Sequence, residues 1–510
     1  MRHSLRQLFN PIEAATWLQS QVQQGSLHTD SRKIKSGDGF IAWPGAASDG
    51  RQYVASSLNA GAQACLVEQS GAESFGFADE RIASYSGLKA DSGRIAAEYY
   101  GHPSQHMDVV AVTGTNGKTS TAWWIAQALN ALKSQRSLSN HEHFAQYSCG
   151  LVGTLGIGTP GAMQLTGLTT PDPVMLQAAL HQMRSQGASA CAMEASSIGL
   201  AEHRMAGVQI KVAIFTNFTQ DHLDYHGSMD AYWEAKRSLF EWAGLESAVI
   251  NVDDPKGQEL VQLAKQRGLR LVTTSQHRQD AMLLANNMRF DAQGMLFDLH
   301  ESDDVQTVRC PSIGGYNIAN ALGVIGAMQC LGITTMHAIQ ALAQCMAVPG
   351  RMEMLGASNE PLLVVDYAHT PDALTQAIHA LRPITAARGG QLWCVFGCGG
   401  NRDASKRPLM GRAAMAADKL VVTSDNPRNE APEAIAAQVM QGIAASQTAV
   451  LHLQRAEAIA LAVEKAQAQD VILVAGKGHE DYQEIAGVKH PFSDVAQARA
   501  ALKQRKQVMA

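Results

Sequence analysis

The sequence lacks any long apolar run, and its longest ones fall well short of the roughly 20 residues that a membrane-spanning helix needs. Its first residues, MRHSLRQLFN, also lack the apolar core of a secretory signal peptide. These two absences lead us to expect a cytoplasmic protein with no membrane partner.

Cysteine is scarce, and basic residues are not in excess. The eight cysteines among 510 residues form no C-x-x-C pair, which is typical of reduced core residues and argues against a disulfide framework or a zinc site. A formal net charge of −5 argues against a general nucleic-acid binder, whose basic face would show in the total. What remains is an ordinary soluble chain, too long for one hydrophobic core, for which we expect two to four domains.

The strongest local signal is the stretch MDVVAVTGTNGKTST at 107–121. Its apolar residues predict a buried strand, a glycine turn follows, and helix-forming residues continue to about Leu132. In such a turn the backbone N–H groups converge on an anion, and the helix N-terminus adds partial positive charge. Lys118 would supply a cation for the outer phosphates of a nucleotide, and a hydroxyl of Thr119 or Ser120 can reach Mg²⁺. The spacing alone is only moderately specific, because a valine stands where the full phosphate-binding pattern has its first glycine.

Two further apolar segments in the middle of the chain, 190–193 and 212–216, predict additional strands. In open α/β sheets, ligands bind at the carboxyl ends of the strands, so the polar residues just beyond them are candidates. After the first segment, Glu194 could hold Mg²⁺ or a water on it, or could cap a helix; the two alternatives are about equally supported. After the second, four potential ligands favour a metal or phosphate site, although their spacing does not say which of them binds. They are Asp221, His222, Asp224 and His226.

A helix is predicted at 232–240, with Tyr232, Lys236 and Phe240 on one face. A lysine on an apolar helical face usually extends its ammonium group to solvent. The functional alternative is a lysine carried into the site, either as a cation or after chemical modification.

The last part of the chain repeats the alternation of strand and helix and predicts another parallel, Rossmann-like sheet. Its apolar segments lie at 361–365, 392–396, 419–423 and 471–475. Turns beyond three of them bring two arginines, two acids and backbone donors to one edge of the sheet. The charged residues are Arg402, Asp425, Arg428 and Glu480. Arginine binds a carboxylate and acids bind an ammonium group, so this mixture fits a zwitterionic ligand.

Clusters of glycine and proline suggest two domain boundaries. Gly101-His-Pro-Ser104 follows a mixed α/β segment, and Val348-Pro-Gly350 ends the middle part. We therefore predict a small α/β domain at 1–104, a central nucleotide-binding domain at 105–348 and a C-terminal domain at 349–510.

The motifs together resemble those of a known family. They are GTNGKT at 114–119, Glu194, Asp221-His222, the Y-x-x-A-K run that ends at Lys236, PGRME at 349–353 and DYAH at 366–369. Their identity and order closely resemble the Mur ligases, the cytoplasmic ATP-dependent enzymes that build the peptide of bacterial cell-wall precursors. The resemblance extends over nearly the whole chain. It implies a three-domain α/β architecture with a central P-loop-type parallel sheet and a Rossmann-like C-terminal domain.

Within the family the chain looks most like the MurE group, which adds the third amino acid to UDP-MurNAc-L-Ala-D-Glu. The DNPR run at 425–428 is similar to the signature of members that add meso-diaminopimelate rather than lysine. The family route activates the D-Glu carboxylate as an acyl phosphate, with release of ADP, and the amine of diaminopimelate then displaces phosphate. The resemblance thus implies ATP and Mg²⁺ as cofactors, the UDP-MurNAc dipeptide and meso-diaminopimelate as substrates, a monomer, and no nucleic-acid partner.

The resemblance also implies roles for single residues. The implied nucleotide contacts are Gly114, Thr115, Asn116, Gly117, Lys118, Thr119, Ser120, Asn317, Arg351 and Asp366. The implied metal ligands are Thr119, Glu194, His222 and Lys236, the last as the carbamylated lysine of this family. The implied catalytic residues are Lys118, Glu194, His222 and Lys236. The implied contacts to the UDP-sugar peptide are Ser31, Thr169, Thr170, Ser196 and Arg204. The implied diaminopimelate contacts are Arg402, Asp425, Asn426, Arg428, Gly476 and Glu480.

Three stretches depart from the MurE pattern, and they concern UDP-sugar binding. Ala195-Ser-Ser-Ile198 stands where Val-Ser-Ser-His is common, and Gly45-Ala-Ala47 replaces a Gly-His-Gln-like stretch. The polar residues 134–147, which we interpret as a surface loop, look like an insertion.

The sequence leaves two alternative functions open. One is another ligase of the same superfamily, of the lysine-adding or folylpolyglutamate type. The other, from a different class, is a P-loop ATPase that uses nucleotide to switch conformation. A pure binding or scaffold protein is the least supported, because the lysine, glutamate and aspartate–histidine motifs form a set suited to metal and phosphate.

Overall fold

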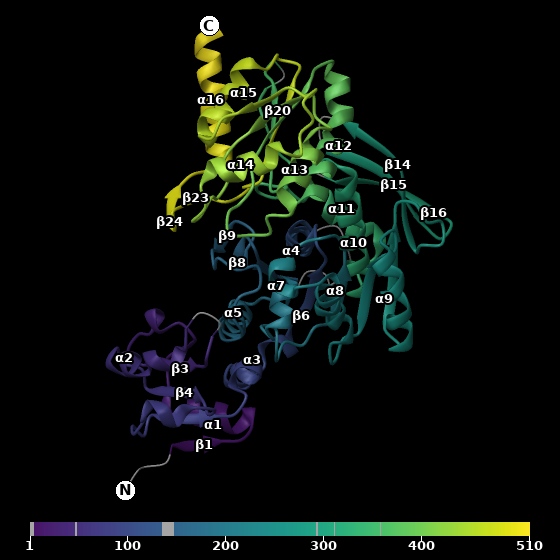
Figure 1. The fold of residues 1–510 in the computed structure, drawn as a ribbon. Helices are drawn as coiled ribbons and strands as arrows, with labels where there is room; N and C mark the ends of the chain where they lie inside the picture. The colour runs from purple at the N-terminus through teal and green to yellow at the C-terminus, as the bar shows by residue number, and fades with distance from the viewer. Residues whose placement is uncertain are drawn as a thin grey trace.

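The computed structural model describes residues 5–45, 48–134, 147–291, 294–310, 312–357 and 359–509. It contains three large sheets that follow one another along the molecule from the N-terminus to the C-terminus (Figure 1). Each sheet is built from the alternation of strand and helix that the sequence predicts, and helices cover both faces of each.

The N-terminal sheet has five parallel strands in the order β1-β5-β4-β3-β2. The strands are β1 (Arg6–Leu8), β2 (Leu27–His28), β3 (Gly39–Ala42), β4 (Ala64–Glu68) and β5 (Ile82–Tyr85). Helices α1 (Pro11–Gln21) and α3 (Leu88–Tyr99) cover one face, and α2 (Val54–Asn59) covers the other. Helix α1 begins where it does because the Asn10 side chain accepts a hydrogen bond from the N–H of Glu13 and proline occupies the first helical position.

The central sheet has eleven strands in the order β16-β15-β14-β13-β12-β11-β6-β10-β7-β8-β9. The strands are β6 (Asp108–Thr113), β7 (Cys149–Gly153), β8 (Gly156–Thr159), β9 (Ala162–Gln164), β10 (Ala190–Glu194), β11 (Val212–Phe215), β12 (Ser247–Asn251), β13 (Arg270–Ser275), β14 (Leu283–Asp291), β15 (Gly294–Glu301) and β16 (Asp304–Cys310). The strands from β14 through β6 to β7 are parallel, as predicted around the glycine turn. The antiparallel pairings of β14 with β15, β15 with β16, β7 with β8, and β8 with β9 were not predicted.

Strand β6 lies in the middle of this sheet, and its side chains alternate between two cores. Val110 and Val112 pack into the core under one set of helices, and Val109 and Ala111 pack into the core under the other. A strand buried on both faces is apolar throughout, which is why the sequence shows a continuous apolar run there. The first face is covered by α4 (Lys118–Ser134), α10 (Gly315–Cys330) and α11 (Thr335–Leu342). The second is covered by α5 (Pro173–Ser185), α6 (Ser197–Ala201), α8 (Met229–Arg237) and α9 (Pro255–Gln266), and the short α7 (Leu223–His226) precedes α8.

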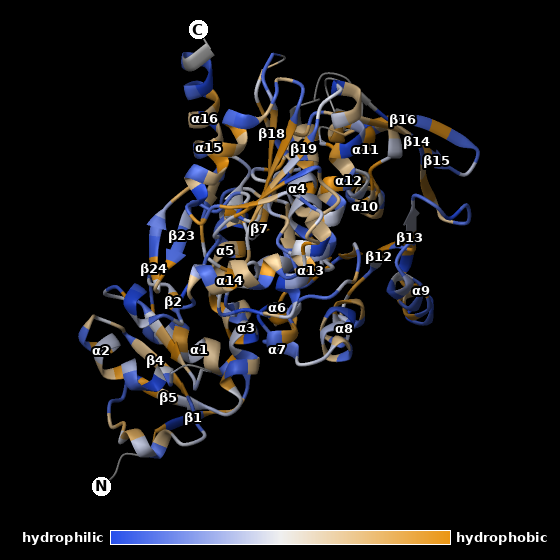
Figure 2. Cartoon of the chain, turned by 45° about the horizontal axis from the view of Figure 1, so that its top comes forward, coloured by the Kyte–Doolittle hydropathy of each residue, from blue (hydrophilic) through white to orange (hydrophobic). Residues whose placement is uncertain are grey.

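The C-terminal sheet has six strands in the order β17-β18-β22-β19-β20-β21, and all pairings except β17 with β18 are parallel. The strands are β17 (Glu353–Leu355), β18 (Leu362–Asp366), β19 (Leu392–Phe396), β20 (Lys419–Val422), β21 (Ala449–Leu451) and β22 (Val471–Ala475). Helices α12 (Pro371–Arg388), α13 (Lys406–Ala414) and α14 (Pro432–Met440) cover one face, and α15 (Arg455–Lys465) and α16 (Asp494–Met509) cover the other. A separate hairpin is formed by β23 (Tyr482–Ile485) and β24 (Val488–Pro491). Figure 2 shows the apolar residues concentrated in strands such as β18 and β19, while outer helices such as α9 are hydrophilic.

The two glycine- and proline-rich segments lie between the sheets. His102 adopts a left-handed φ of 51° just before β6, and Gly350 has a φ of 64° just before β17. The division into domains at 104 and 348 stays a prediction. The surface loop predicted at 134–147 lies almost wholly outside the described residues, as do Ala46 and Ala47. Among the described residues, no helix is both long enough and apolar enough to cross a membrane.

Candidate active site

The predicted phosphate cradle is the turn between β6 and α4. Strand β6 ends at Thr113, α4 begins at Lys118, and Gly114 and Gly117 between them have φ of 147° and 85°. Positive φ values of this size favour glycine. A Cβ on Gly114 would also lie 1.9 Å from the hydroxyl oxygen of Thr216, so the turn has no room for a side chain at that position.

The Lys118 side chain bends back over this turn. Its Nζ donates to the carbonyl oxygens of Gly114 and Thr115, both at 2.8 Å. Burial lowers the pKa of Lys118, and the nearby carboxylates of Glu194 and Asp221 oppose that shift. An ammonium group has three N–H donors, so in the described part of the chain one donor remains for an incoming oxygen anion.

Glu194, at the end of β10, is almost completely buried and is held by two threonines. Its Oε2 accepts a hydrogen bond from Thr119 Oγ1 at 2.9 Å, and its Oε1 accepts one from the N–H of Thr154 at 2.8 Å. Helix α6, which follows, is capped by Ser196, whose hydroxyl accepts the N–H of Gly199 at 3.0 Å. The helix-capping alternative for Glu194 is therefore wrong. Its carboxylate and the Thr119 hydroxyl are hard oxygen donors of the kind that Mg²⁺ prefers.

The four potential ligands at 221–226 do not converge on one point. Asp224 Oδ2 faces Arg402 of the C-terminal region at 3.9 Å from its guanidinium, and His226 Nε2 is hydrogen-bonded to Ser197 Oγ at 3.0 Å. Within the ranges that the structure describes, no group of three or more His, Cys, Asp or Glu side chains is placed to hold a metal ion. These four side chains therefore do not form a metal site by themselves, and whether one of them binds a metal or a phosphate stays a prediction.

Asp221 and His222 nevertheless lie in the electrostatic field of the cradle. Burial would raise the pKa of Asp221, but the neighbouring His222, His369 and Lys406 lower it to about 2. Burial lowers the pKa of His222, whose Nε2 lies 3.6 Å from Asp221 Oδ2. At neutral pH the imidazole of His222 is therefore uncharged, and an uncharged imidazole is the form that binds a metal.

Lys236 points into the protein. Its side chain is 1% exposed, and its Nζ donates to the carbonyl of Gly114 at 2.7 Å and lies 4.4 Å from the ring centre of Tyr232. Burial, reinforced by the charge of Lys118, lowers the pKa of Lys236 well below its ordinary value. The solvent-extended alternative is therefore wrong, and the lysine beside the cradle gives up its proton more easily than an ordinary one.

Two asparagines of helix α10 pack against the turn. Asn317 donates to the carbonyl of Ile313 at 2.8 Å and accepts a hydrogen bond from Asn320 Nδ2 at 2.9 Å. A Cβ on Gly117 would lie 2.3 Å from Asn320 Oδ1, so the second glycine of the turn is needed for this contact.

The C-terminal region also reaches the cradle. Arg351 donates to the Thr119 hydroxyl at 3.3 Å, and its guanidinium lies 4.4 Å from the ring centre of Tyr367. Asp366 accepts the N–H of Met352 at 2.8 Å, and burial raises its pKa. Of the other cradle residues, Asn116 donates to Asp372 Oδ2 at the start of α12 at 3.2 Å, and Ser120 is buried in the first turn of α4.

Four of the five residues implied to contact a sugar peptide gather beside Glu194. They are Thr169, Thr170, Ser196 and Arg204. The hydroxyl of Thr170 lies 3.0 Å from that of Ser196 and donates to the backbone carbonyl of Glu194 at 2.8 Å, and Arg204 donates to the carbonyl of Thr170 at 3.0 Å. Ser31 stands apart, at the start of a short 3₁₀ helix in the N-terminal region.

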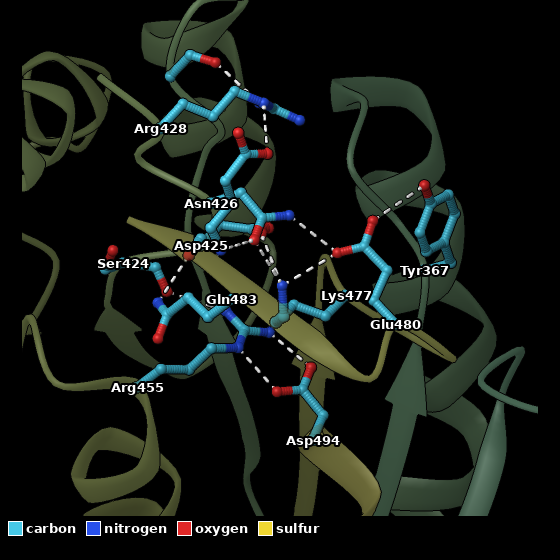
Figure 3. Close-up of polar contacts among 12 residues, drawn as sticks. Tyr367, Ser424, Asp425, Asn426, Arg428, Arg455, Lys477, Glu480, Gln483 and Asp494 are labelled. Carbon is cyan, nitrogen blue, oxygen red and sulfur yellow. Dashed lines mark hydrogen bonds and ion pairs between the residues drawn. The ribbon is translucent and has the colours of Figure 1, made fainter. Parts of the chain in front are cut away.

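A second candidate site lies where β20 and β22 end (Figure 3). Asp425 and Asn426 follow β20, Gly476 and Glu480 follow β22, and Asn426 Nδ2 donates to Glu480 Oε2 at 2.9 Å. A Cβ on Gly476 would lie 2.5 Å from Asp425 Oδ2, so glycine lets that carboxylate approach the strand end. The structure thus brings together four of the six residues implied to bind the amino acid, and we call them the strand-end cluster.

The two implied arginines are placed differently. Arg428 lies at the edge of the strand-end cluster, where it donates to the carbonyl of Gly400 at 2.8 Å and lies 3.4 Å from a carboxylate oxygen of Glu484 (Figure 3). Arg402 is 57% exposed and faces Asp224 of the central region.

Sequence reasoning gave no role to three residues that the structure places in the cluster. Lys477 is fully buried at its centre. From β23, Gln483 donates to the carbonyl of Asp425 at 2.6 Å, and the N–H of Glu484 donates to Asn426 Oδ1 at 2.9 Å. Lys477 could have been identified from the sequence, because it lies between two glycines just beyond a predicted strand. The sequence of β23 contains no comparable signal for Gln483 and Glu484.

Comparison with known proteins gives a consistent result over the full chain. Residues 112–328 match the family model described as Mur ligase middle domain, and residues 350–478 match the one described as Mur ligase, glutamate ligase domain. The chain is 54% identical over 504 residues to the UDP-N-acetylmuramoyl-L-alanyl-D-glutamate--2,6-diaminopimelate ligase of Acidovorax sp. (strain JS42), with 99% of each chain covered. The chain belongs to the Mur ligase family. A protein of the same name from Pseudomonas aeruginosa is 44% identical over 503 residues, with 98% of each chain covered.

Solved structures agree with the fold of this Mur ligase. A UDP-N-acetylmuramoyl-L-alanyl-D-glutamate--2,6-diaminopimelate ligase matches with a TM-score of 0.63 at 35% identity, over 94% of this chain and 95% of that chain. The MurF ligase from Thermotoga maritima, in complex with ADP, matches with a TM-score of 0.67 over 96% of this chain and 99% of that chain. At 18% identity, the second match shows the fold alone. The α/β architecture that the resemblance implied is confirmed.

In this Mur ligase, Gly114→Ala should weaken ADP binding by about tenfold or more, because alanine is strained at this φ and its Cβ would collide with Thr216. Titration calorimetry with Mg²⁺–ADP measures the effect. Gly268→Ala is the matched control, since Gly268 also has a positive φ, 66°, but no atom lies within 4 Å of its Cβ position. Equal ADP affinity in the Gly114 variant and the wild type would show that the turn does not hold the nucleotide.

Proposed function

We propose that the chain is an ATP-dependent ligase that joins meso-diaminopimelate to UDP-MurNAc-L-Ala-D-Glu, with ADP and phosphate as the other products. The observation that carries this proposal is the presence of two different sites in one molecule. One is a lysine-lined phosphate cradle, and the other is a cluster of acids beside an arginine. The names of the relatives at 54% and 44% identity support it. Its substrates are water-soluble small molecules, so we place the reaction in the cytoplasm.

In this proposal the cradle holds the triphosphate. The remaining N–H of Lys118 binds the outer phosphates, and Arg351 adds a second cation through its contact with Thr119. The residues that would hold Mg²⁺ are Thr119, Glu194 and His222, with Lys236 contributing oxygen only if its amine carries a carbamate; hydroxyl, carboxylate and imidazole donors fit such an ion. When bound, Mg²⁺ would draw charge from the phosphoryl oxygens and make the γ-phosphorus easier to attack.

The acid to be activated would lie beside Glu194, against the hydroxyls of Thr170 and Ser196. In the first step, a carboxylate oxygen of the D-Glu residue forms a bond to the γ-phosphorus, and the bond from that phosphorus to ADP breaks. The difficulty is that two anions must approach each other. Lys118 and Arg351 reduce this repulsion by placing positive charge around the phosphoryl group.

The strand-end cluster would hold the amino acid in the second step. Arg428 binds its distal carboxylate, and Asp425 and Glu480 bind its distal ammonium group. The free amine at the other end then attacks the acyl phosphate, the carbon–oxygen bond to phosphate breaks, and the amine loses a proton. The residues of the chain act here by holding the amine near the acyl carbon.

The runner-up is a ligase of the same superfamily that adds a different amino acid. Folylpolyglutamate synthase from Mycobacterium tuberculosis has the same fold, with a TM-score of 0.59 at 17% identity, and this likeness concerns the fold alone. Arg428 at the edge of a cluster with two acids favours a diamino acid with a distal carboxylate over lysine or glutamate.

Phosphate release with a panel of amino acids tests the proposal. With ATP, Mg²⁺ and UDP-MurNAc-L-Ala-D-Glu present, release should depend on meso-diaminopimelate and be far slower with L-lysine, L-glutamate or no amino acid. Lys118→Ala should reduce the rate by about 10³-fold or more without changing the melting temperature, because it removes the phosphate-facing cation. Phosphate release that is independent of any amino acid would favour a nucleotide-driven switch instead.

Arg428→Ala should raise KM for meso-diaminopimelate by about 10²-fold and change KM for ATP by less than about twofold, since the distal carboxylate loses its guanidinium partner. Steady-state kinetics with each substrate varied in turn gives both values. Arg382→Ala is the matched control, because Arg382 pairs with Asp418 at the opposite end of β20. An equal rise in both KM values for the Arg428 variant would contradict its assignment to the amino acid.

We also propose that Lys236 carries a carbamate. Its buried amine has a pKa well below the ordinary value, and the uncharged amine adds to CO₂ with loss of one proton. Enzyme equilibrated with ¹³C-bicarbonate should show one protected carbamate carbon by NMR, and this signal should be absent in Lys236→Met. A wild-type spectrum without such a signal would leave Lys236 as a plain amine.

A further inference from the structure

Lys477 lies at the centre of the strand-end cluster, and its role is not explained by contact with a ligand. Its side chain is fully buried, and its Nζ lies 2.9 Å from Asn426 Oδ1, 3.0 Å from Glu480 Oε2 and 3.6 Å from Asp425 Oδ1 (Figure 3). An ammonium group has three N–H donors, and here three oxygens surround it. Two of the donors make hydrogen bonds, and the third faces Asp425 at a distance too long for one. Because the side chain is fully buried behind these partners, Lys477 is a positioning residue rather than a binding one.

This lysine fixes the orientation of Asn426. The Oδ1 atom of Asn426 accepts hydrogen bonds from Lys477 and from the N–H of Glu484, at 2.9 Å each, which turns Nδ2 toward Glu480. Oε2 of Glu480 then accepts hydrogen bonds from both Asn426 Nδ2 and Lys477 Nζ. Among the described residues, the other carboxylate oxygen of Glu480 accepts one long hydrogen bond of 3.4 Å, from the hydroxyl of Tyr367, so this oxygen remains open to a ligand.

The backbone on both sides of Lys477 is tightly packed. A Cβ on Gly478 would lie 2.6 Å from the carbonyl of Gly350, and one on Gly476 would meet Asp425. Arg455 donates to the carbonyls of Ala475, at the end of β22, and Ser424, just after β20, at 2.9 and 3.4 Å. These hydrogen bonds hold the ends of the two strands together.

The charges behind the cluster cancel one another. Arg455 is completely buried and paired with Asp494 at 2.7 Å, so the pair adds no net charge to the cluster. Within the cluster, Lys477 cancels one of the two carboxylate charges of Asp425 and Glu480. At its edge, Arg428 and Glu484 form a further pair. The cluster therefore presents a single excess negative charge beside a guanidinium that can bind a carboxylate.

We propose that Lys477 determines which diamino acid the enzyme accepts: by cancelling one acidic charge, it favours an amino acid whose distal end carries both ammonium and carboxylate over one whose distal end carries ammonium alone. This inference rests on the proposed function. Without Lys477, the cluster would hold two uncompensated carboxylates, which attract a lone ammonium group and repel a distal carboxylate.

The test compares meso-diaminopimelate with L-lysine in wild type and Lys477→Met, with L-lysine assayed both as a substrate and as a competitive inhibitor. The ratio of kcat/KM for diaminopimelate to that for lysine, or the corresponding ratio of inhibition constants, should fall by about tenfold or more in the variant. KM for ATP should stay within about twofold. Lys477→Arg keeps the positive charge and should keep most of the discrimination.

Lys489→Met is the matched control. Lys489 Nζ lies 4.0 Å from the ring centre of Tyr482, and Lys477 Nζ lies 5.5 Å from it, but Lys489 is exposed on β24. Its removal should leave the ratio unchanged. A loss of activity on both amino acids by the same factor in Lys477→Met would show a purely structural role and overturn the proposal.

A second variant and the wild-type assay cover the cases in which Lys477→Met gives no answer. If Lys477→Met does not fold, Lys477→Gln, which keeps a hydrogen-bond donor without the charge, should show the same fall in the ratio, and an unchanged ratio would overturn the proposal. Wild-type enzyme that releases no phosphate with diaminopimelate would refute the proposed function itself. That failure is visible before any variant is assayed.

Discussion

The carbonyl oxygen of Gly114 accepts hydrogen bonds from two lysines, Lys118 at 2.8 Å and Lys236 at 2.7 Å. Burial lowers the pKa of both lysines, and the charge of Lys118 lowers that of Lys236 further, because two ammonium groups so close together repel each other. The arrangement is relieved when an anion binds between them or when one amine loses its charge. The turn between β6 and α4 is thus suited to receive negative charge, whether from phosphate or from a carbamate.

The two sites are joined by a short series of side-chain contacts. Arg351 touches the Thr119 hydroxyl at one end and lies over the ring of Tyr367 at the other, and the Tyr367 hydroxyl donates to Glu480. The segment that follows the second glycine- and proline-rich cluster therefore does more than connect two sheets. It places one cation against the cradle and one aromatic ring against the strand-end cluster, so in the proposed function the distance between the activated acid and the incoming amine would depend on how this segment packs.

Apolar runs and glycine turns in the sequence predicted the parallel strands and the phosphate cradle, which are determined by residues close together in the chain. The apolar runs at 190–193 and 471–475 became β10 and β22, and the glycine turn before Lys118 became the cradle. The antiparallel strands β14 to β16 and the hairpin β23–β24 were missed, because their position depends on contacts between distant segments. The acids and histidines at 221–226 are close in sequence, yet the backbone turns them toward different partners. Periodicity placed Lys236 on an apolar face, but only the position of the Gly114 carbonyl explains why it points inward.

The charge of each site also decides which end of the amino acid it can hold. An ammonium group bound by buried carboxylates keeps its proton, and a protonated amine has no lone pair with which to attack an acyl phosphate. In the proposed function, Asp425 and Glu480 would therefore bind the amine that does not react. The reacting amine has to lie beyond the cluster, toward the cradle, where the cations of Lys118 and Arg351 disfavour its protonated form. In the proposed function, the contrast between an acidic cluster and a cationic cradle would thus orient a molecule with two amines and favour the uncharged form of the reactive one.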